Sequence, residues 1–179
     1  MVDKTLAMKG NKYYCYLIID AEQLVLLIDS LEDKSWNIEA CDLENFKQII
    51  IYIGKGCCNR KMMHLIEAKN ILNDGFKQGY NGLKIDRILN IWKRGGGIIA
   101  LQIFSDSDNY ISMAREYAMI KAAKNYISNI YNGAMYGPMI NDWTDQETKN
   151  FGDILLYFAF KQCILEQPSP IFSSSIKKK

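Results

Sequence analysis

Apolar residues form two kinds of pattern along the chain, continuous runs and helical repeats, and these patterns predict the order of its strands and helices. Continuous apolar runs predict buried β-strands at 12–20, 49–54 and 98–104. Segments in which apolar residues recur every three or four positions predict helices at 59–72, 83–94 and 109–126, with a last one from Thr144 to about 167. The first two strands are expected to pair.

The segment between the first two strands, 21–48, is polar and mixed, so we interpret it as an insert. Within it, only 42–49 has the pattern of one or two helical turns, opened by Asp42. The order of strands, helices, a third strand and further helices predicts an α+β fold in one domain. That domain is expected to span 1–167, followed by a flexible tail at 168–179.

Composition narrows the function classes. The 179 residues are 49% hydrophobic and 23% charged, which is ordinary for one globular domain with a core. A net charge of +2 means that nucleic-acid binding would need a local basic patch. Five cysteines without a CxxC pair argue against a zinc or redox site and predict an intracellular protein, nuclear or cytoplasmic. No apolar run approaches the roughly 20 residues that span a bilayer, so we expect no membrane partner.

Glu116 is a carboxylate inside an apolar helix face. On the helix 109–126, its neighbours on the same face are Met113, Met119, Ile120 and Ala123. Carboxylates are rarely buried unless they are paired or bind a metal. Two interpretations remain open, namely an ion pair or water-facing edge, and a ligand for a hard metal ion.

Arg60 and the only histidine, His64, are neighbours at i and i+4 on the helix 59–72. The helical wheel places them with Glu67, away from the apolar residues. Arginine can fork onto two phosphate oxygens, and histidine can act as an acid or a base. The alternative is a solvated polar face. Gly54 and Gly56, just before, are expected to form a tight strand-to-helix turn.

Tyr16 and Tyr52 lie on the first two predicted strands and would face the same side if those strands pair. They are either packed core residues or residues whose hydroxyl groups belong to a site. A phenol has an ordinary pKa near 10 and is a poor base unless a nearby cation lowers that pKa. The stretch "GKG" at 54–56 lacks the Walker pattern, which argues against nucleotide binding.

In combination, these residues resemble the GIY-YIG nucleases. Tyr14-Cys15-Tyr16 stands for the family's GIY-like triplet, with Tyr14 and Cys15 in place of Gly-Ile, and Tyr52-Ile53-Gly54 matches the second triplet unchanged. Four further positions match in the right order: Arg60, His64, Glu116 and Asn129. Across 14–167, stretches such as "YIGKGCCNRKMMHLIEA" and "ISNIYNGAMYG" are most similar to the branch of ankyrin-repeat and LEM-domain endonucleases.

The resemblance implies a small, mostly antiparallel sheet of about three strands flanked by helices, with an extra C-terminal helix. It implies a metal-dependent, structure-selective DNA endonuclease that cuts branched or flapped DNA and leaves a 5′-phosphate and a 3′-hydroxyl. One Mg²⁺ or Mn²⁺ would bind Glu116, and Arg60 would clamp the phosphate. Tyr16 or His64 would serve as the base, while Tyr52 and Asn129 would position the phosphate.

DNA is the expected partner, and further domains of a longer chain are compatible with the resemblance. We expect the DNA backbone to be bound by basic residues: Lys55, Lys61, Lys93 and Arg94, with Lys84 and Arg87 as further candidates. An unpaired base could stack on Tyr80, Trp92 or Tyr136. The rival hypothesis is a non-catalytic DNA- or protein-binding module on the same fold.

Overall fold

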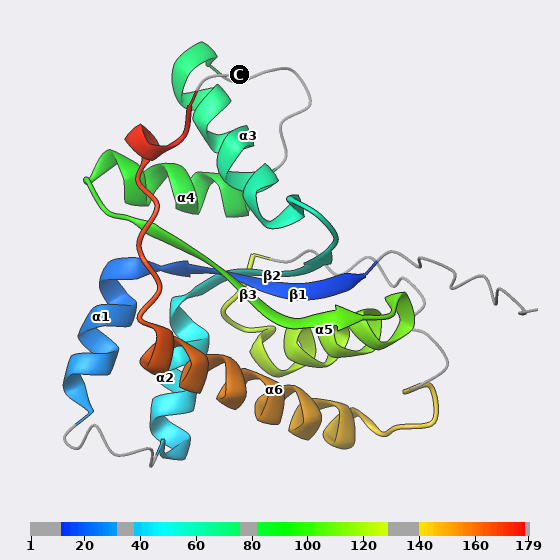
Figure 1. The fold of residues 1–179 in the computed structure, drawn as a ribbon. Coiled ribbons are helices and arrows are strands. Elements are labelled where there is room, and N and C mark those ends of the chain that lie inside the picture. The colour runs from blue at the N-terminus through cyan, green and yellow to red at the C-terminus, as the bar shows by residue number, and fades with distance from the viewer. Residues whose placement is uncertain (1–11, 32–37, 76–81, 129–139, 178–179) are drawn as a thin grey trace, which may run out of the picture.

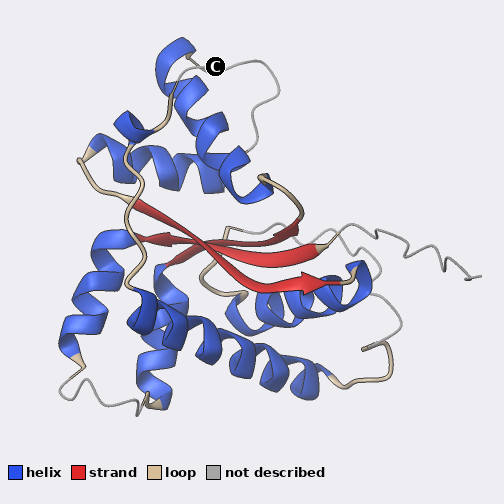
Figure 2. Ribbon diagram, in the orientation of Figure 1, coloured by secondary structure: helices blue, strands red, loops and turns tan. Residues whose placement is uncertain are grey.

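The computed structural model describes residues 12–31, 38–75, 82–128 and 140–177. Helices lie on both faces of one sheet (Figures 1 and 2). The elements in chain order are β1 (Tyr13–Asp20), α1 (Ala21–Ser30), α2 (Ala40–Ile49), β2 (Ile50–Gly56), α3 (Arg60–Asp74), α4 (Leu83–Lys93), β3 (Ile98–Ser107), α5 (Asn109–Ala123), α6 (Asp145–Glu166) and the short 3₁₀ helix η1 (Ser173–Ser175).

The sheet has three antiparallel strands in the order β2-β1-β3. β1 is central and buried, and its side chains alternate between the two faces. Cys15, Leu17 and Ile19 contribute to one core cluster, whereas Tyr14, Tyr16 and Ile18 contribute to the other. The predicted α+β class and the predicted pairing of the first two strands are therefore confirmed.

The two faces of the sheet are covered by different helices (Figure 1). On one face, which we call the α5/α6 face, α1, α2, α5 and α6 pack over the sheet around residues such as Phe46 and Phe160. On the other, the α3/α4 face, α3 and α4 pack through Leu65 and Ile88. The two candidate tyrosines of the sheet belong to the α3/α4 face.

Helix α1 corrects the prediction of a polar insert after the first strand. It begins directly after β1, where the Asp20 carboxylate accepts hydrogen bonds from the backbone N–H groups of Glu22 at 3.1 Å and Gln23 at 3.4 Å. Leu24 is buried, but the neighbouring Leu26 is 61% exposed. Apolar residues on both sides of this helix obscured its periodicity in the sequence.

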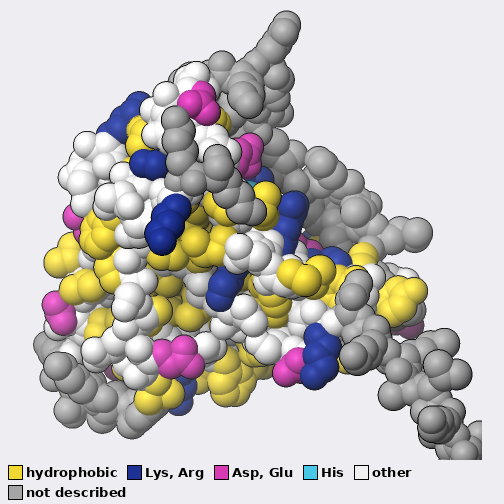
Figure 3. Space-filling view, turned by 45° about the horizontal axis from the view of Figure 1, so that its top comes forward, with side chains coloured by type: hydrophobic (Ala, Val, Ile, Leu, Met, Phe, Trp, Pro, Cys, Tyr) yellow, Lys and Arg dark blue, Asp and Glu magenta, His cyan; other side chains and the backbone are white. Residues whose placement is uncertain are grey.

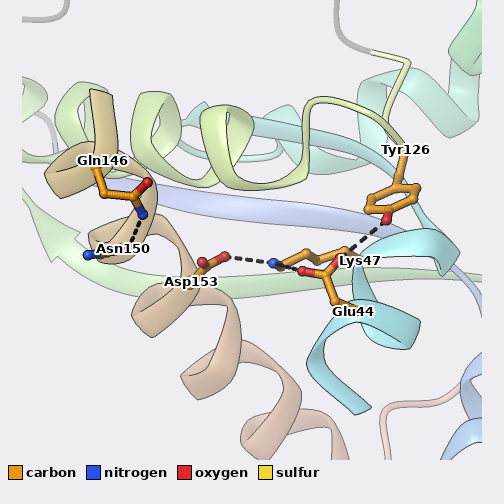
Figure 4. A network of polar contacts seen from close by, with 6 residues as sticks. All are labelled: Glu44, Lys47, Tyr126, Gln146, Asn150 and Asp153. Carbon is orange, nitrogen blue, oxygen red and sulfur yellow. Dashed lines mark hydrogen bonds and ion pairs between the residues drawn. The ribbon is translucent and has the colours of Figure 1, made fainter. Parts of the chain in front are cut away.

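A buried lysine joins α2 to α6. Lys47 is fully buried, and its Nζ lies 2.5 Å from Glu44 Oε1 and 2.7 Å from Asp153 Oδ1 (Figure 4). Burial opposes the charge of Lys47, but the hydrogen bonds to Asp153 and Glu44 outweigh it and raise the lysine pKa. The Tyr126 hydroxyl donates to Glu44 at 3.2 Å and links this group to the chain after α5.

Helices α5 and α6 both begin at residues whose side chains cap the first turn. Asp108 accepts a hydrogen bond from the backbone N–H of Ile111 at 2.8 Å, and Thr144 forms a capping box with Glu147. The two helices approach closely where Gly152 faces the backbone oxygen of Ala118, with no space for a side chain. Helix α5, which carries Glu116, is thus fixed between the sheet and α6.

The segment after α6 makes defined contacts as far as η1. Ile171 forms an antiparallel bridge with Ile98, through hydrogen bonds of 3.0 and 2.7 Å. Its carbonyl oxygen also accepts a hydrogen bond from Nε1 of Trp92 at 3.2 Å. The segment, predicted as a flexible tail, runs from α6 past the sheet to the α3/α4 side (Figure 1). Trp92 is 6% exposed, which corrects its assignment as a base-stacking residue.

Candidate active site

Tyr16 lies in the middle of the sheet, opposite Gly54 of β2. A Cβ atom at Gly54 would lie 2.5 Å from the Tyr16 ring, so only glycine leaves room for the phenol. Gly56 is likewise in β2, where the Arg60 side chain occupies the space of a Cβ. The predicted glycine turn is therefore wrong, because the strand continues through both glycines. The chain turns instead at Cys57–Asn59, where Cys58 has a φ of 53°.

Tyr16 and His64 form a buried hydrogen-bonded pair. The Tyr16 hydroxyl lies 2.9 Å from Nε2 of His64, and the two residues are 1% and 4% exposed. The Tyr52 ring packs edge-on against the imidazole, with ring centroids 4.7 Å apart. The strand tyrosines thus share one face, as the sequence predicts.

The burial of His64 corrects the prediction that it shares a solvent-facing side with Arg60. The buried residues of α3 are His64, Leu65 and Ala68, so the histidine belongs to the face that packs on the sheet. Arg60, the first residue of the helix, is exposed. The helical wheel places His64 by its polarity alone. In the structure, the sheet-facing side of α3 can hold this polar residue because the Tyr16 hydroxyl and the Tyr52 ring contact the imidazole there.

Both members of the pair are neutral at neutral pH. Burial lowers the pKa of His64 to about 4, and the nearby charges of Lys84 and Arg60 contribute. Burial also raises the pKa of the Tyr16 phenol, an effect that Tyr52 strengthens and Arg60 opposes. A neutral phenol beside a neutral imidazole nitrogen can pass a proton along this hydrogen bond.

Lys84, in the first turn of α4, belongs to this group of residues. Its Nζ lies 4.9 Å from the centroid of the Tyr52 ring, and its charge lowers the pKa of His64. Burial lowers the pKa of Lys84 itself, and Glu67 opposes the shift. From the sequence, Lys84 is only a candidate for contact with the DNA backbone, because its place here depends on how α4 packs against α3 and β2.

Glu116 extends from α5 to the outer edge of β2. Its Oε1 accepts a hydrogen bond from the backbone N–H of Lys55 at 2.9 Å. Burial raises the pKa of the half-buried carboxyl group, and Lys55 opposes that effect. The charge of Glu116 in turn contributes to the raised pKa values of Tyr52 and Tyr16. The carboxylate therefore lies within electrostatic range of the tyrosines.

The donor set around Glu116 fits a hard divalent ion. Within the part of the chain that the structure describes, no three His, Cys, Asp or Glu side chains come together as a metal cluster. Glu116 offers carboxylate oxygens, one of which already has the Lys55 N–H as a partner. Mg²⁺ commonly binds one or two carboxylates and keeps several waters, so a single glutamate is compatible with it.

The four predicted DNA-binding residues lie in different surroundings. The Nζ of Lys55 donates to Asn109 Oδ1 at 2.6 Å, and Lys61 follows Arg60 in the first turn of α3. Lys93 is exposed at the end of α4. Arg94 pairs with Asp20 at 2.5 Å, at the end of β1 remote from Tyr14. On the face drawn in Figure 3, Lys and Arg side chains are scattered among apolar ones.

Asn129, Tyr80 and Tyr136 lie outside the described residues, so their predicted roles stay predictions. The chain that leads to Asn129 is held beside the site. The backbone N–H of Ser128 donates to the Ile51 carbonyl at 2.9 Å, next to Tyr52 in β2. Arg87 of α4 also donates to the Tyr126 carbonyl at 2.9 Å.

Comparison with known proteins adds independent information. Residues 13–178 match the family model described as LEM-3-like GIY-YIG domain. The chain is 29% identical over 160 residues to the Ankyrin repeat and LEM domain-containing protein 1 homolog of Caenorhabditis elegans, covering 88% of this chain and 21% of that protein. It is 26% identical over 149 residues to Ankyrin repeat and LEM domain-containing protein 1 of Homo sapiens, covering 82% and 23%.

The chain therefore spans only about a fifth to a quarter of these relatives. No solved structure matches it. Among the described residues, no helix has the length and apolar character needed to cross a membrane. The match over nearly the whole chain agrees with the three-stranded antiparallel sheet and confirms the resemblance of its motifs. The chain belongs to the LEM-3-like GIY-YIG domain family and is a DNA endonuclease domain of the GIY-YIG type.

Proposed function

We propose that this domain hydrolyses phosphodiester bonds of branched or flapped DNA, with one Mg²⁺ or Mn²⁺ ion, and leaves a 5′-phosphate and a 3′-hydroxyl. The main support is the buried Tyr16–His64 pair, with 2.9 Å between the hydroxyl oxygen and Nε2. Arg60 and Glu116 both act on the pKa of Tyr16. A proton acceptor, a phosphate-binding cation and a carboxylate that can hold a metal ion together suit metal-assisted hydrolysis of a phosphodiester.

Tyr16 and His64 accept the proton of the attacking water together. Because the Tyr16 phenol is protonated, its oxygen takes the proton of the water only as its own proton passes to Nε2 of His64. Burial lowers the His64 pKa in the free protein, and the charges of Lys84 and Arg60 lower it further. A bound phosphate offsets those charges and makes the imidazole a stronger base when substrate is present.

The cations of the site bind the phosphate. Arg60 is exposed at the start of α3, and its guanidinium can hold two non-bridging oxygens. Lys84, over the Tyr52 ring, adds positive charge on the same side. Tyr52 packs against His64 and keeps the imidazole oriented, and Asn129 positions the phosphate.

Glu116 holds the divalent ion together with water. When bound, the ion supplies positive charge that stabilises the scissile phosphate and the leaving oxygen. The hydrogen bond from the Lys55 backbone to Oε1 fixes the carboxylate at the edge of β2, and the remaining carboxylate oxygen would be the one to hold the ion.

The wider role is also a proposal. The relatives are named for ankyrin repeats and LEM domains and are much longer than this chain. We propose that the full protein acts inside the cell, in the nucleus or cytoplasm, on branched DNA that arises in DNA repair. Lys55, Lys61, Lys93 and Arg94 would contact the backbone away from the cut phosphate.

The test uses labelled four-way junctions, flaps and linear duplexes of one sequence, incubated with Mg²⁺, Mn²⁺ or EDTA. Glu116→Ala and Arg60→Ala are each expected to lower the cleavage rate about 10²–10³-fold. Glu166→Ala, at an exposed glutamate at the end of α6, is the matched control and should cut like the parent protein. End-labelling of the products identifies the terminal phosphate.

Each part of the proposal has its own contrary result. Cutting that survives EDTA or Glu116→Ala would disprove the metal assignment. Equal rates on junctions and linear duplexes would disprove the preference for branched DNA. Binding without cleavage of any substrate would favour the non-catalytic module.

A further inference from the structure

Tyr14 stands where the GIY-like triplet of the family has glycine, and its hydroxyl reaches the turn that precedes Arg60. Tyr14 is 5% exposed on the α3/α4 face. Its hydroxyl donates to the Cys58 carbonyl oxygen at 2.9 Å and accepts from the backbone N–H of Lys61 at 3.3 Å. One side chain of β1 therefore holds both the turn and the first turn of α3.

Helix α3 lacks the usual devices that fix a helix start. Its N-cap residue, Asn59, makes no side-chain cap hydrogen bond, and its first turn contains no acidic residue. The first N–H groups of a helix need acceptors from outside the helix. The Arg60 N–H donates to the Cys57 carbonyl at 3.2 Å, whereas the Lys61 N–H donates to the Tyr14 hydroxyl.

The turn itself is in an unfavourable conformation. Cys58 has a φ of 53°, a left-handed value that costs free energy for a residue with a Cβ atom. The hydrogen bond from Tyr14 is made to the carbonyl of this same residue. Immediately after the turn, the Arg60 stem packs against Gly56. The direction of Arg60 therefore depends on a turn that Tyr14 stabilises from the sheet.

We propose that Tyr14 is a positioning residue for Arg60, and that its hydroxyl substitutes for the missing cap of α3. This inference rests on the proposed role of Arg60 at the phosphate. Glycine at this position could not provide the hydroxyl, so the departure from the family triplet is a functional feature of this chain. The alternative is simple core packing of the Tyr14 ring, which contacts Tyr16 edge-on at 6.1 Å between centroids.

Tyr14→Phe separates the two explanations, because it removes the hydroxyl and keeps the ring. Under single-turnover conditions with Mg²⁺, we expect the cleavage rate to fall about tenfold, less than the roughly 10²–10³ for losing the Arg60 contact itself. In an Arg60→Ala background, the same change should cost less than about twofold, because the two residues act through one contact.

The matched control is Tyr126→Phe, which removes a phenol hydrogen bond to Glu44 near α2. Both variants should lower the melting temperature slightly, but only Tyr14→Phe should slow cleavage. An unchanged rate in Tyr14→Phe would overturn the proposal. An equal loss with and without Arg60 would also overturn it.

Amide hydrogen exchange tests the same inference without any activity. In Tyr14→Phe, peptides that cover 57–64 should exchange roughly two- to tenfold faster, the factor that one hydrogen bond contributes. Peptides from α5 and α6 should not change. Unchanged exchange at 57–64 would overturn the capping role even if the parent protein cuts no DNA. Absence of cleavage together with faster exchange would overturn only the nuclease mechanism.

Discussion

The Tyr16 hydroxyl lies 2.9 Å from Nε2 of His64, and the two side chains are buried between the sheet and α3. The pair unites the first strand with the helix that follows the second strand, 48 residues later. Because burial disfavours charge on either group, the pair is held as phenol and imidazole.

We predict that His64 titrates with a midpoint of about 4. It is the only histidine, so its ring protons give one unambiguous NMR signal once any affinity tag is removed. Lys84→Met should raise the midpoint, because the Lys84 charge contributes to the lowered pKa. Burial is the larger cause, so the midpoint should stay below its ordinary value near 6.5.

The control for this titration is Lys93→Met, which removes an exposed lysine at the far end of α4. It should leave the midpoint unchanged. A midpoint near 6.5 in the parent protein would mean that the imidazole is in water and not against Tyr52.

We predict that the low pKa of His64 in the fold makes the domain less stable in mild acid. The pKa of His64 is about 4 in the folded protein, against an ordinary value of 6.5, which applies in the unfolded chain. Between these values the unfolded chain binds more protons, so the free energy of unfolding falls as pH is lowered from about 6.5 to 4. Urea unfolding at pH 7 and pH 5 measures this loss. His64→Gln should show a smaller loss, whereas an identical loss would assign it to other groups.

The sequence predicts most of this fold, because the strands are continuous apolar runs and the long helices have a clear period. It misses α1, since Leu26 is apolar yet exposed on that helix. It finds Tyr16, Arg60 and Glu116 as candidates but places His64 on the wrong side of α3. A helical wheel contains no information on the side chains of the sheet that face the helix. Here the Tyr16 phenol of the sheet faces the His64 imidazole.

The same limit explains what the sequence analysis missed. Lys84 joins the site only through packing between α4 and its neighbours, and Tyr14 is visible in sequence only as a mismatch to a motif. The partners of its hydroxyl, Cys58 and Lys61, are 44 and 47 residues away, so no local pattern connects them.

We predict that Gly54→Ala disturbs the site through Tyr16. The added Cβ would lie 2.5 Å from the Tyr16 ring, which cannot move without leaving His64. The free energy of unfolding should fall by about 1–3 kcal/mol, the usual cost of overpacking. In a Tyr16→Ala background the same change should cost little. Additive losses, measured by urea unfolding, would show that the clash is relieved elsewhere.

We predict that Lys47→Ala lowers the free energy of unfolding by about 1.5–3 kcal/mol, because it leaves the carboxylates of Glu44 and Asp153 without their buried partner. The matched control is Lys121→Ala, since Lys121 pairs with Asp145 at 2.7 Å and that carboxylate is 88% exposed. Exposed pairs contribute under about 1 kcal/mol. Equal losses of unfolding free energy in chemical denaturation would show that the buried Lys47 ion pairs stabilise the fold no more than an exposed pair does.

We predict that truncation after Pro170 destabilises the domain. It removes Ile171, the partner of Ile98, and leaves the Trp92 indole N–H without its acceptor. The cost should be about 1–3 kcal/mol. Removal of Lys178 and Lys179 alone is the control. A melting temperature unaffected by the longer truncation would support the prediction that 168–179 form a flexible tail.

Glu116 also affects the outer backbone edge of β2. Among the described residues, β2 pairs with β1 and with no other strand, so its outer backbone groups face away from the sheet. Such open edges can recruit strands from other molecules, and natural proteins block them with charges or helices. By accepting the Lys55 N–H, Glu116 brings both a charge and α5 to this edge. The residue that would hold the metal therefore also disfavours pairing of the β2 edge with a strand of another molecule.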